Sequence, residues 1–530
     1  MKPFITFVSL PQHTWYPPYG LLSLASYLNH NTGLKAGILN LTSSKDFEND
    51  MLGILREQRP EYVGFSCFTS DFNDVIRYAA AVKKEIGAKI IVGNAHASLL
   101  PEDFIYEGSP VDYAVVGEGE VSLTELALAL SRGENPAGIP GVALLGPGGK
   151  FLQGPKRDLI PDLGVLPPLD HGLIDMGPYL SPFAKLFVGI SLRTFLVHTS
   201  RGCPSVCEFC AANTIWKCNS GFSVRSRPLE AVLGEIETLK EKYKIQAFLI
   251  ADDSFTIKKQ RVLDFCRAIK GSGLIWGCQA RILQVDEEMI VAMKDAGCVM
   301  LMFGVESGSD AVLARIRKGQ TAEQITRTFD LCKKHGVKTL ADIMCNHPGE
   351  TEEDVRLTQR LLDRIRPDEL SLSVMTPYPG TAIYEKYVHP KLEKAQYDLL
   401  KTRGPAVVKY FKLCRHELPL QEVLNDYSGR VYGFRLPTSV SLLGDPRYFR
   451  KVFLSGNIAA NLSALGWDLF LRMRISLLGA LPLSVRKRIK AKGNRLRDRL
   501  ERVYSPRPGT FLKRLFDSIL GTPSEEDKTE

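Results

Sequence analysis

The sequence predicts an α/β protein with an N-terminal doubly wound (Rossmann-like) parallel sheet, then a partial (β/α)6 TIM-type barrel, then a mainly α-helical C-terminal extension. Short β-rich runs alternate with helical stretches over the first 145 residues, and the alternation resumes with a longer repeat after residue 190. With 530 residues and 44% hydrophobic content, the chain can bury more than one core. We therefore expect domains at residues 1–145, 191–400 and 401–530, with a linker at 146–190.

Five strands are expected in the first region, and polar, glycine-rich segments follow three of them. The strands are Ile5 to Ser9, Ala36 to Asn40, Tyr62 to Cys67, Lys89 to Val92 and Tyr113 to Val116, with helices such as Gly20 to Asn29 and Phe72 to Glu85 between them. The polar segments are Ser66 to Ser70, Gly93 to Ser98 and Gly117 to Glu120. Parallel sheets of this kind bind ligands at the carboxyl ends of their strands, and glycine lets the backbone approach a ligand closely.

The segment from Gly146 to Pro182 is rich in proline, glycine and aspartate, which predicts an ordered linker without long regular elements. Six strands are expected after it, with amphipathic helices between them. The strands are Leu192 to His198, Ala247 to Ala251, Trp276 to Gln279, Val299 to Gly304, Thr339 to Cys345 and Glu369 to Met375; the helices include Pro228 to Lys242, Glu287 to Ala296, Thr321 to His335 and Glu352 to Ile365. This pattern predicts a barrel or partial barrel with reactive groups at the strand carboxyl ends.

Three cysteines form the most informative motif of the chain. Cys203, Cys207 and Cys210 stand in a C-x3-C-x2-C spacing behind Ser200-Arg201-Gly202. Three thiolates on one loop can hold three irons of a [4Fe-4S] cube and leave the fourth iron open for chemistry. A zinc or four-thiolate site closed by Cys218, and three unrelated buried thiols, are the alternatives.

This spacing, with Phe209 before the last cysteine, resembles the cluster loop of the radical S-adenosylmethionine (SAM) superfamily, and the resemblance extends from Leu192 to Tyr384. It implies that SAM chelates the open iron and is reductively cleaved to a 5'-deoxyadenosyl radical. The positions that match SAM contacts of this family are Phe209, Asp252, Asp253, Gln279, Arg281, Glu306 and Ser307. Asp252 and Asp253 stand where the family often has Gly-Gly-Glu, and a buried ion pair of Arg281 with Glu306 or Asp253 is the competing interpretation.

Three segments of the first region together resemble the cobalamin-binding domain that precedes many radical SAM enzymes: Pro17 to Ala25, Gly93 to Ser98 and Val115 to Glu120. The resemblance implies cobalamin contacts at Tyr19, Ser66, Phe68, Gly93, Asn94, His96, Gly117, Glu118, Gly119 and Glu120. The cobalt-ligating Asp-x-His-x-x-Gly signature is absent, and Asn94 replaces a frequent second glycine. His96 is either a cobalt ligand or a structural residue, and a domain that has lost its ligand is the remaining alternative.

Charge is concentrated near the C-terminus. The segment from Arg472 to Arg502 holds eleven Lys or Arg and two acids, 11 − 2 = +9, which equals the net charge of the whole chain. Such a basic region favours peripheral contact with an anionic membrane over nucleic acid, and a helical appendage on the barrel is the alternative. We expect a cytoplasmic protein, or one bound at the inner face of the membrane, because eleven cysteines do not form a disulfide framework and no apolar run spans a bilayer.

Together the resemblances imply a cobalamin-dependent radical SAM C-methyltransferase. In this hypothesis a substrate radical takes a methyl group from methylcobalamin, a second SAM remethylates cobalt, and flavodoxin or ferredoxin supplies single electrons. A hydrophobic small molecule is the expected substrate, and Cys345, His347 and Tyr378 are candidate proton or hydrogen-atom donors near it. The alternatives are an oxidative cyclase like the anaerobic magnesium-protoporphyrin ester cyclases, a radical SAM enzyme with an empty first domain, and a non-catalytic corrinoid carrier.

Overall fold

The computed structural model describes residues 2–11, 16–42, 44–180, 192–221, 224–389, 398, 401, 411–432 and 466. The chain divides into two compact units, residues Met1–Leu186 with Ser191–Val423 and residues Phe187–Ile190 with Leu424–Glu530. Both predicted sheets belong to the first unit. The basic segment from Arg472 to Arg502 lies outside the described residues.

The first sheet has seven strands in the order β2-β1-β3-β4-β5-β6-β7, and β1 to β5 are parallel. Its strands are β1 (Ile5–Ser9), β2 (Ala36–Asn40), β3 (Tyr62–Ser66), β4 (Lys89–Gly93), β5 (Tyr113–Val115), β6 (Val142–Leu145) and β7 (Phe151–Gln153). Its helices are α1 (Tyr19–Asn31), α2 (Phe47–Gln58), α3 (Phe72–Glu85), α4 (Ala95–Leu99) and α5 (Gly119–Ser131). The order 2-1-3-4-5 is that of a doubly wound sheet with its crevice between β1 and β3.

Two hydrophobic cores cover the two faces of this sheet. One core contains Met51 of α2 and Val75 of α3, and the other contains Leu28 of α1 and Leu126 of α5. Buried apolar side chains on alternate strand positions supply both cores, which is why the β-rich runs of the sequence predict the strands well. The doubly wound prediction is confirmed.

The hairpin of β6 and β7 extends the sheet beyond the parallel strands. Both of these strands pair antiparallel, β6 on β5 and β7 on β6. The remaining described segment up to residue 180 contains one short helix, α6 (Gly177–Leu180), and two short 3-10 turns, Leu163–Val165 and His171–Leu173. Among the described residues, no helix is both long and apolar enough to cross a bilayer.

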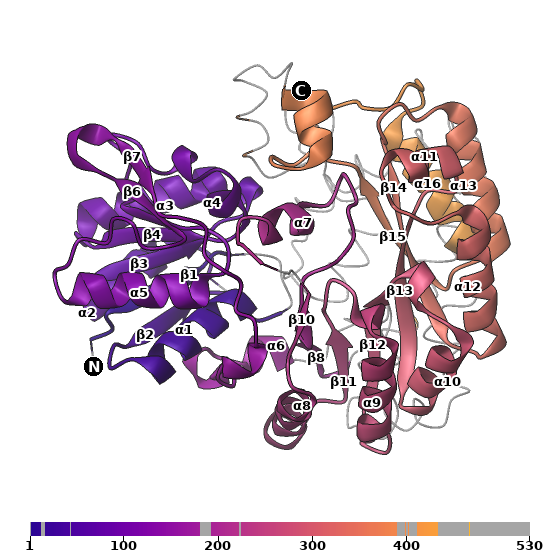
Figure 1. The fold of residues 1–530 in the computed structure, drawn as a ribbon, viewed down its shortest axis with the longest axis horizontal. Helices are drawn as coiled ribbons and strands as arrows, with labels where there is room; N and C mark the ends of the chain where they lie inside the picture. The colour runs from indigo at the N-terminus through magenta and orange to yellow at the C-terminus, as the bar shows by residue number, and fades with distance from the viewer. Residues whose placement is uncertain are drawn as a thin grey trace, which may run out of the picture. The chain divides into compact units, whose positions relative to one another are not determined.

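The second sheet has six strands, all parallel, in the order β15-β14-β13-β12-β11-β8. Its strands are β8 (Thr194–Val197), β11 (Ala247–Ile250), β12 (Ile275–Ala280), β13 (Cys298–Glu306), β14 (Lys338–Cys345) and β15 (Glu369–Val374). The helices between them are α8 (Leu229–Tyr243), α9 (Lys259–Ile269), α10 (Glu287–Asp295), α11 (Asp310–Arg315), α12 (Ala322–Lys334) and α13 (Glu352–Ile365); α16 (Leu420–Tyr432) follows later. Figure 1 shows these strand-linking helices on one side of the curved sheet, so the partial barrel is confirmed.

The two faces of the barrel sheet differ in chemistry. On the helix-covered face, Phe248 stacks on Trp276 with a centroid separation of 6.0 Å, and Phe303 contacts Phe329 of α12 at 5.4 Å. On the opposite, concave face, Asp342 lies between its register partners Gly304 and Ser371. Because side chains alternate along a strand, every second residue of each strand points to this concave face, where it can contact a ligand in the barrel.

Local signals fix the ends of the barrel helices. Thr351 and Asp354 form a capping box at the start of α13, in which the Thr351 hydroxyl accepts from the Asp354 amide at 3.3 Å. The same arrangement of Thr321 and Gln324 begins α12. Thr351 therefore fixes the start of α13 by capping it.

Candidate functional site

The cysteine motif lies on the loop between β9 (Ser200–Arg201) and α7 (Ala211–Trp216), and Cys207 is buried while Cys203 and Cys210 are half-buried. The loop is held against the barrel because the Glu208 amide donates to the Ile316 carbonyl at 3.0 Å and the Glu208 carbonyl accepts from Ile383 at 3.1 Å. Within the described ranges, no three His, Cys, Asp or Glu side chains converge on one ion. A cube does not require such convergence, since each thiolate binds a different iron.

Cys218 does not supplement this loop. Its thiol donates to the Ser98 carbonyl at 3.2 Å, and burial raises its pKa. A protonated thiol engaged with a carbonyl is a poor metal ligand. The four-thiolate alternative therefore has no support in the contacts of Cys218.

Other cysteines pack as apolar residues. Burial raises the pKa of the Cys332 and Cys345 thiols to about 12, and raises those of Cys266, Cys278 and Cys414 as well. The expectation that Cys345 faces a cavity is wrong, because it alternates with the lumen-facing positions of β14 and lies on the buried face.

The strand that leads into the cysteine loop is anchored by Asp252. This buried carboxylate accepts from the Thr199 amide and the Thr199 hydroxyl, both at 2.6 Å, and from the Ser200 hydroxyl at 2.7 Å. The neighbouring Asp253 is exposed and accepts from the Trp216 indole at 3.0 Å. Both carboxylate oxygens of Asp252 thus accept hydrogen bonds from the protein itself. Its predicted contact with SAM gains no support from this geometry.

Three predicted SAM residues are brought together around Lys318, a residue that no sequence motif marks. The Arg281 guanidinium donates to the hydroxyl of Ser205 in the cysteine loop and to the Lys318 carbonyl, the latter at 3.1 Å. The Lys318 ammonium lies 2.6 Å from a Glu306 oxygen and 5.6 Å from the centre of the Phe209 ring. The competing interpretation, an ion pair of Arg281 with Glu306 or Asp253, gains no support, because Glu306 pairs with Lys318.

The remaining two predicted SAM residues lie elsewhere. Ser307 is fully buried, and its hydroxyl contacts the Thr358 hydroxyl of α13 at 3.2 Å, so it serves packing. Gln279 lies on the concave face and donates to the Met302 sulfur at 3.7 Å. Of the two, only Gln279 is placed to meet a ligand in the barrel.

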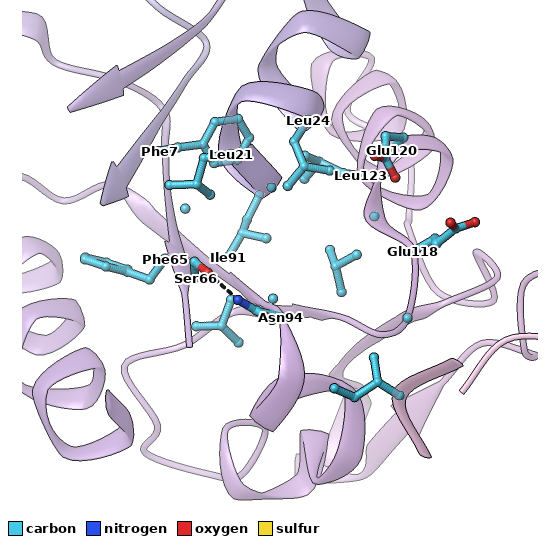
Figure 2. Close-up of a pocket in the computed structure, with 18 of the residues that line it drawn as sticks. Phe7, Leu21, Leu24, Phe65, Ser66, Ile91, Asn94, Glu118, Glu120 and Leu123 are labelled. Carbon is cyan, nitrogen blue, oxygen red and sulfur yellow. Dashed lines mark hydrogen bonds between the residues drawn. The ribbon is translucent and has the colours of Figure 1, made fainter. Parts of the chain in front are cut away.

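A cavity of about 250 Å³ opens at the carboxyl ends of β1, β3, β4 and β5. Figure 2 shows Ser66 and Asn94 on one side and Glu118 and Glu120 on another, with Leu21, Leu24 and Ile91 among the apolar side chains between. The predicted cobalamin residues that line it are Ser66, Gly93, Asn94, Gly117, Glu118, Gly119 and Glu120. This is the crevice at which doubly wound sheets bind ligands.

Tyr19, Phe68 and His96 are not among the residues that line this cavity. The Tyr19 hydroxyl donates to the Leu196 carbonyl of the barrel, and Phe68 is 45% exposed. His96 is fully buried, with one ring nitrogen 3.1 Å from the Thr69 hydroxyl and the other 3.0 Å from an Asp103 oxygen. The structural interpretation of His96 fits better than a cobalt ligand, because both ring nitrogens are occupied.

Asn94 has an unusual backbone for a non-glycine residue, with φ 78° and ψ −163°. This region is almost restricted to glycine, and such strain concentrates at functional sites. The side chain donates to the Ser66 hydroxyl at 2.8 Å and accepts from the Ala95 amide at 2.7 Å. Asn94, which stands where this family often has glycine, is thus a residue with a strained backbone on the cavity wall.

The segment from Gly117 to Glu120, here called the cavity loop, contains two glycines that packing requires. A Cβ atom on Gly117 would lie 2.2 Å from the Asn219 side-chain oxygen, and one on Gly119 would lie 2.9 Å from Leu24. By contrast, a Cβ on Gly20 would meet nothing within 4 Å, and one on Gly93 only Val115 at 3.8 Å. Room for a ligand therefore lies beside Gly20 and Gly93.

The two carboxylates of the cavity loop pair with arginines of the second domain. Glu118 contacts Arg201 at 2.9 Å and Arg225 at 2.8 Å, and Glu120 contacts Arg201 at 2.6 Å. Burial alone would raise the pKa of Glu120, but the Arg201 guanidinium and the Ser23 hydroxyl hold it at about 2. Neither arginine was predicted, because their partners are more than eighty residues away in sequence.

His347 and Tyr378 were proton-donor candidates of the barrel. His347 is fully buried, and its Nε2 lies 3.1 Å from the Met344 carbonyl. Tyr378 is 43% exposed, and burial of part of its ring raises its pKa. The position of Tyr378 leaves it available to a ligand, whereas His347 is enclosed by protein.

Comparisons with known proteins support a function for both the cysteine loop and the cavity of the first domain. The model of the radical SAM superfamily matches residues 197–362, and the model of the B12 binding domain matches residues 13–127. The chain is 32% identical over 373 residues to the "Uncharacterized methyltransferase PH0819" of Pyrococcus horikoshii, covering 70% of this chain and 78% of that protein. The chain belongs to the cobalamin-dependent radical SAM enzymes. The predicted cofactors, a [4Fe-4S] cluster, SAM and cobalamin, are confirmed as those that the two domains imply.

Two further similarities bear on this family. An anaerobic magnesium-protoporphyrin IX monomethyl ester cyclase of Rubrivivax gelatinosus is 25% identical over 421 residues, which is 78% of this chain and 73% of the cyclase. The fold is similar to that of the radical SAM methyltransferase TsrM from Kitasatospora setae, solved with cobalamin and a [4Fe-4S] cluster bound. That similarity has a TM-score of 0.59 and 21% identity, covering 72% of this chain and 74% of TsrM.

Proposed function

We propose that this radical SAM enzyme methylates an unactivated carbon of a small, largely apolar molecule. The observation that supports this proposal is that one compact unit holds the cysteine loop and the cavity of the first domain, with Arg201 bonded to the cavity wall two residues before Cys203. When bound, SAM at the cluster supplies the radical that removes hydrogen, and methylcobalamin supplies the methyl group.

Cys203, Cys207 and Cys210 would hold the cluster. They fit this role because two of the three thiols are half-exposed on a loop whose backbone is fixed to the barrel. Ser205 belongs to this loop and its hydroxyl accepts from Arg281, so these two residues would contact a SAM molecule bound at the cluster. We place SAM there.

Arg281 and Glu306 suit the two charged groups of the methionine part of SAM. The guanidinium of Arg281 would pair with the SAM carboxylate, and an oxygen of Glu306 would accept from the ammonium or from ribose hydroxyls. The Lys318 ammonium lies 2.6 Å from a Glu306 oxygen and would balance the charge of this carboxylate beside the ligand.

Ser66, Gly93 and Asn94 would hold cobalamin at the carboxyl ends of β3 and β4. The cavity they line has mostly apolar walls, and its polar atoms are concentrated at the Ser66–Asn94 pair and the two loop carboxylates. In the described residues both ring nitrogens of His96 are engaged, so these residues would hold cobalamin without a histidine ligand to cobalt.

The concave face of the barrel supports a hydrophobic substrate. Met302, Leu340 and Met344 share this face with Asp342 by strand alternation and register. The same face carries Gln279 and, by register with Leu340 and Asp342, also Glu369 and Ser371. Such a mixed surface fits a molecule that is mostly hydrocarbon and carries hydrogen-bonding groups, such as a lipid, polyketide or tetrapyrrole. Flavodoxin or ferredoxin would supply electrons, and membrane contact by the basic C-terminal region remains a prediction.

Anaerobic reconstitution with iron, sulfide, SAM and hydroxocobalamin tests the proposal. We expect about four irons and one corrinoid per chain, and 5'-deoxyadenosine on addition of a reductant. The variant Cys203→Ala/Cys207→Ala/Cys210→Ala should lose iron and 5'-deoxyadenosine. The matched control Cys218→Ala should retain both. Equal iron and 5'-deoxyadenosine in the triple variant would refute the assignment of the cluster.

Oxidative cyclisation is the second candidate, favoured by the similarity to the cyclase of Rubrivivax gelatinosus. SAM with a deuterated methyl group separates the two, because methylation adds a labelled methyl to the product and cyclisation adds none. Candidate substrates from the hydrophobic classes above would be assayed with both analyses. A product that has lost hydrogen without gaining label would overturn methyl transfer.

A further inference from the structure

Arg201 connects the two halves of the site described above. Its guanidinium binds two carboxylates of the loop that closes the cavity, Glu118 at 2.9 Å and Glu120 at 2.6 Å. Its backbone continues through Gly202 directly into the first cysteine of the motif. Arg201 is itself among the residues that line the cavity, so a single residue contributes its side chain to the cavity wall and its backbone to the start of the cysteine loop.

The carboxylate side of this connection is rigid. The second oxygen of Glu118 accepts from Arg225 at 2.8 Å and from the Ile160 amide at 3.0 Å, and Ser23 donates to Glu120 at 2.6 Å. The side chains of Glu118 and Glu120 are 6% and 5% exposed, and that of Arg201 is 24% exposed. At such burial a charge-assisted pair is strong and geometrically specific.

The barrel side is also fixed. Asp252 binds Thr199 and Ser200, the two residues before Arg201, through three hydrogen bonds of 2.6 to 2.7 Å. Between Arg201 and the first thiol there is only Gly202, whose φ of 94° turns the chain into the loop. The orientation of the loop thus depends on contacts from both domains at adjacent residues.

We propose that Arg201 is a positioning residue that couples the cavity of the first domain to the cysteine loop. The inference rests on the proposed function, because it assumes that the cavity binds a corrinoid. A ligand that stabilises the loop of Glu118 and Glu120 stabilises the conformation of Arg201, and through it the start of the cysteine loop. By linkage, a cluster on the loop favours corrinoid binding by the same factor.

Hydrogen exchange on the full-length protein, with and without hydroxocobalamin, tests this coupling. In the wild type, hydroxocobalamin should slow exchange in peptides covering residues 200–210 by about five-fold or more, which is the lower range of typical coupling. In Arg201→Gln, hydroxocobalamin should still slow exchange in the cavity loop but leave residues 200–210 unchanged. Arg201→Lys, which can serve only one carboxylate well, should give an intermediate effect.

Arg157→Gln is the matched control. Arg157 also pairs a half-buried guanidinium with a glutamate of α5, Glu125, but it does not continue into the cysteine loop. It should respond to hydroxocobalamin like the wild type. If Arg201→Gln is poorly folded by circular dichroism, Glu120→Gln, which removes one charge with almost no change in volume, replaces it and should show reduced transfer of protection.

Each outcome separates the inference from the proposed function. Protection of residues 200–210 that persists in Arg201→Gln, or in Glu120→Gln, would overturn the coupling role while corrinoid binding stands. Absence of any hydroxocobalamin binding to the wild type, measured by absorbance titration, would overturn both. Loss of protection in the Arg157→Gln control would show a general loss of stability and would also overturn the specific role of Arg201.

Discussion

Replacing Asn94 by glycine and by alanine tests whether the backbone at the cavity wall is strained. Both variants lose the same side-chain hydrogen bonds, to Ser66 and to the Ala95 amide. They differ in how easily they adopt φ 78° and ψ −163°. Glycine accepts this conformation, whereas a residue with a Cβ atom is destabilised there by about 1–3 kcal/mol.

The net effect follows from two opposing terms. Strain in the alanine variant costs about 2 kcal/mol, the middle of that range, and the greater chain entropy of unfolded glycine offsets about 0.5–1 kcal/mol. We therefore expect the segment to be about 1 kcal/mol more stable in Asn94→Gly than in Asn94→Ala. That difference corresponds to about five-fold in an opening equilibrium.

Hydrogen exchange of peptides covering β4 and α4 measures this difference locally, which matters because a chain with several domains has no single unfolding free energy. Asn49, in the first turn of α2, is the matched control. There the ordinary helical preference should make the alanine variant the more stable of the two by about 1 kcal/mol. Equal or slower exchange in Asn94→Ala than in Asn94→Gly would refute the strain at Asn94.

Two further predictions concern the barrel. Burial and the nearby Glu306 raise the pKa of Asp342 to about 6, so its stabilising contribution is complete below the unfolded pKa and is lost as pH rises through 6. Asp342→Asn should therefore have the same melting temperature as the wild type near pH 4 and a higher one at pH 7.5, by an amount equivalent to roughly 2 kcal/mol of stability. A difference that does not change with pH would contradict this. A Cβ on Gly308 would lie 2.6 Å from the backbone of α13, so Gly308→Ala should lower the melting temperature by an amount equivalent to about 1–3 kcal/mol. The control Gly53→Ala, in the open interior of α2, should instead raise it, and equal effects of the two would disprove the packing argument.

Sequence patterns predicted the parallel elements well because each element carries its own signal. The helix Glu352–Ile365 was predicted with both ends correct, since Thr351 caps it and a strongly amphipathic face defines its length. The β6–β7 hairpin was not predicted, because the proline and glycine residues between 146 and 155 are typical of a linker. Only the three-dimensional structure shows that β6 pairs with β5.

The site was predicted in its motifs but not in its contacts. Sequence spacing places three cysteines on one loop, yet it does not show that Asp252 turns toward Thr199 or that His96 turns into the core. Such orientations depend on which neighbours compete for each polar atom in three dimensions. Arg201 and Lys318 carry much of the electrostatics of the site and stand in no motif, because their partners come from distant parts of the chain.

The protonated thiols of the barrel have a consequence for assembly of the cluster. Iron and sulfide capture requires thiolates, and burial keeps Cys266, Cys278 and Cys332 as neutral, space-filling groups at neutral pH. Ferrous iron that reaches the folded chain therefore meets little competition from these positions. Oxidation by dissolved oxygen also depends on how accessible each sulfur is, so inactivation by oxygen should begin at the cysteine loop, where Cys203 and Cys210 are half-buried.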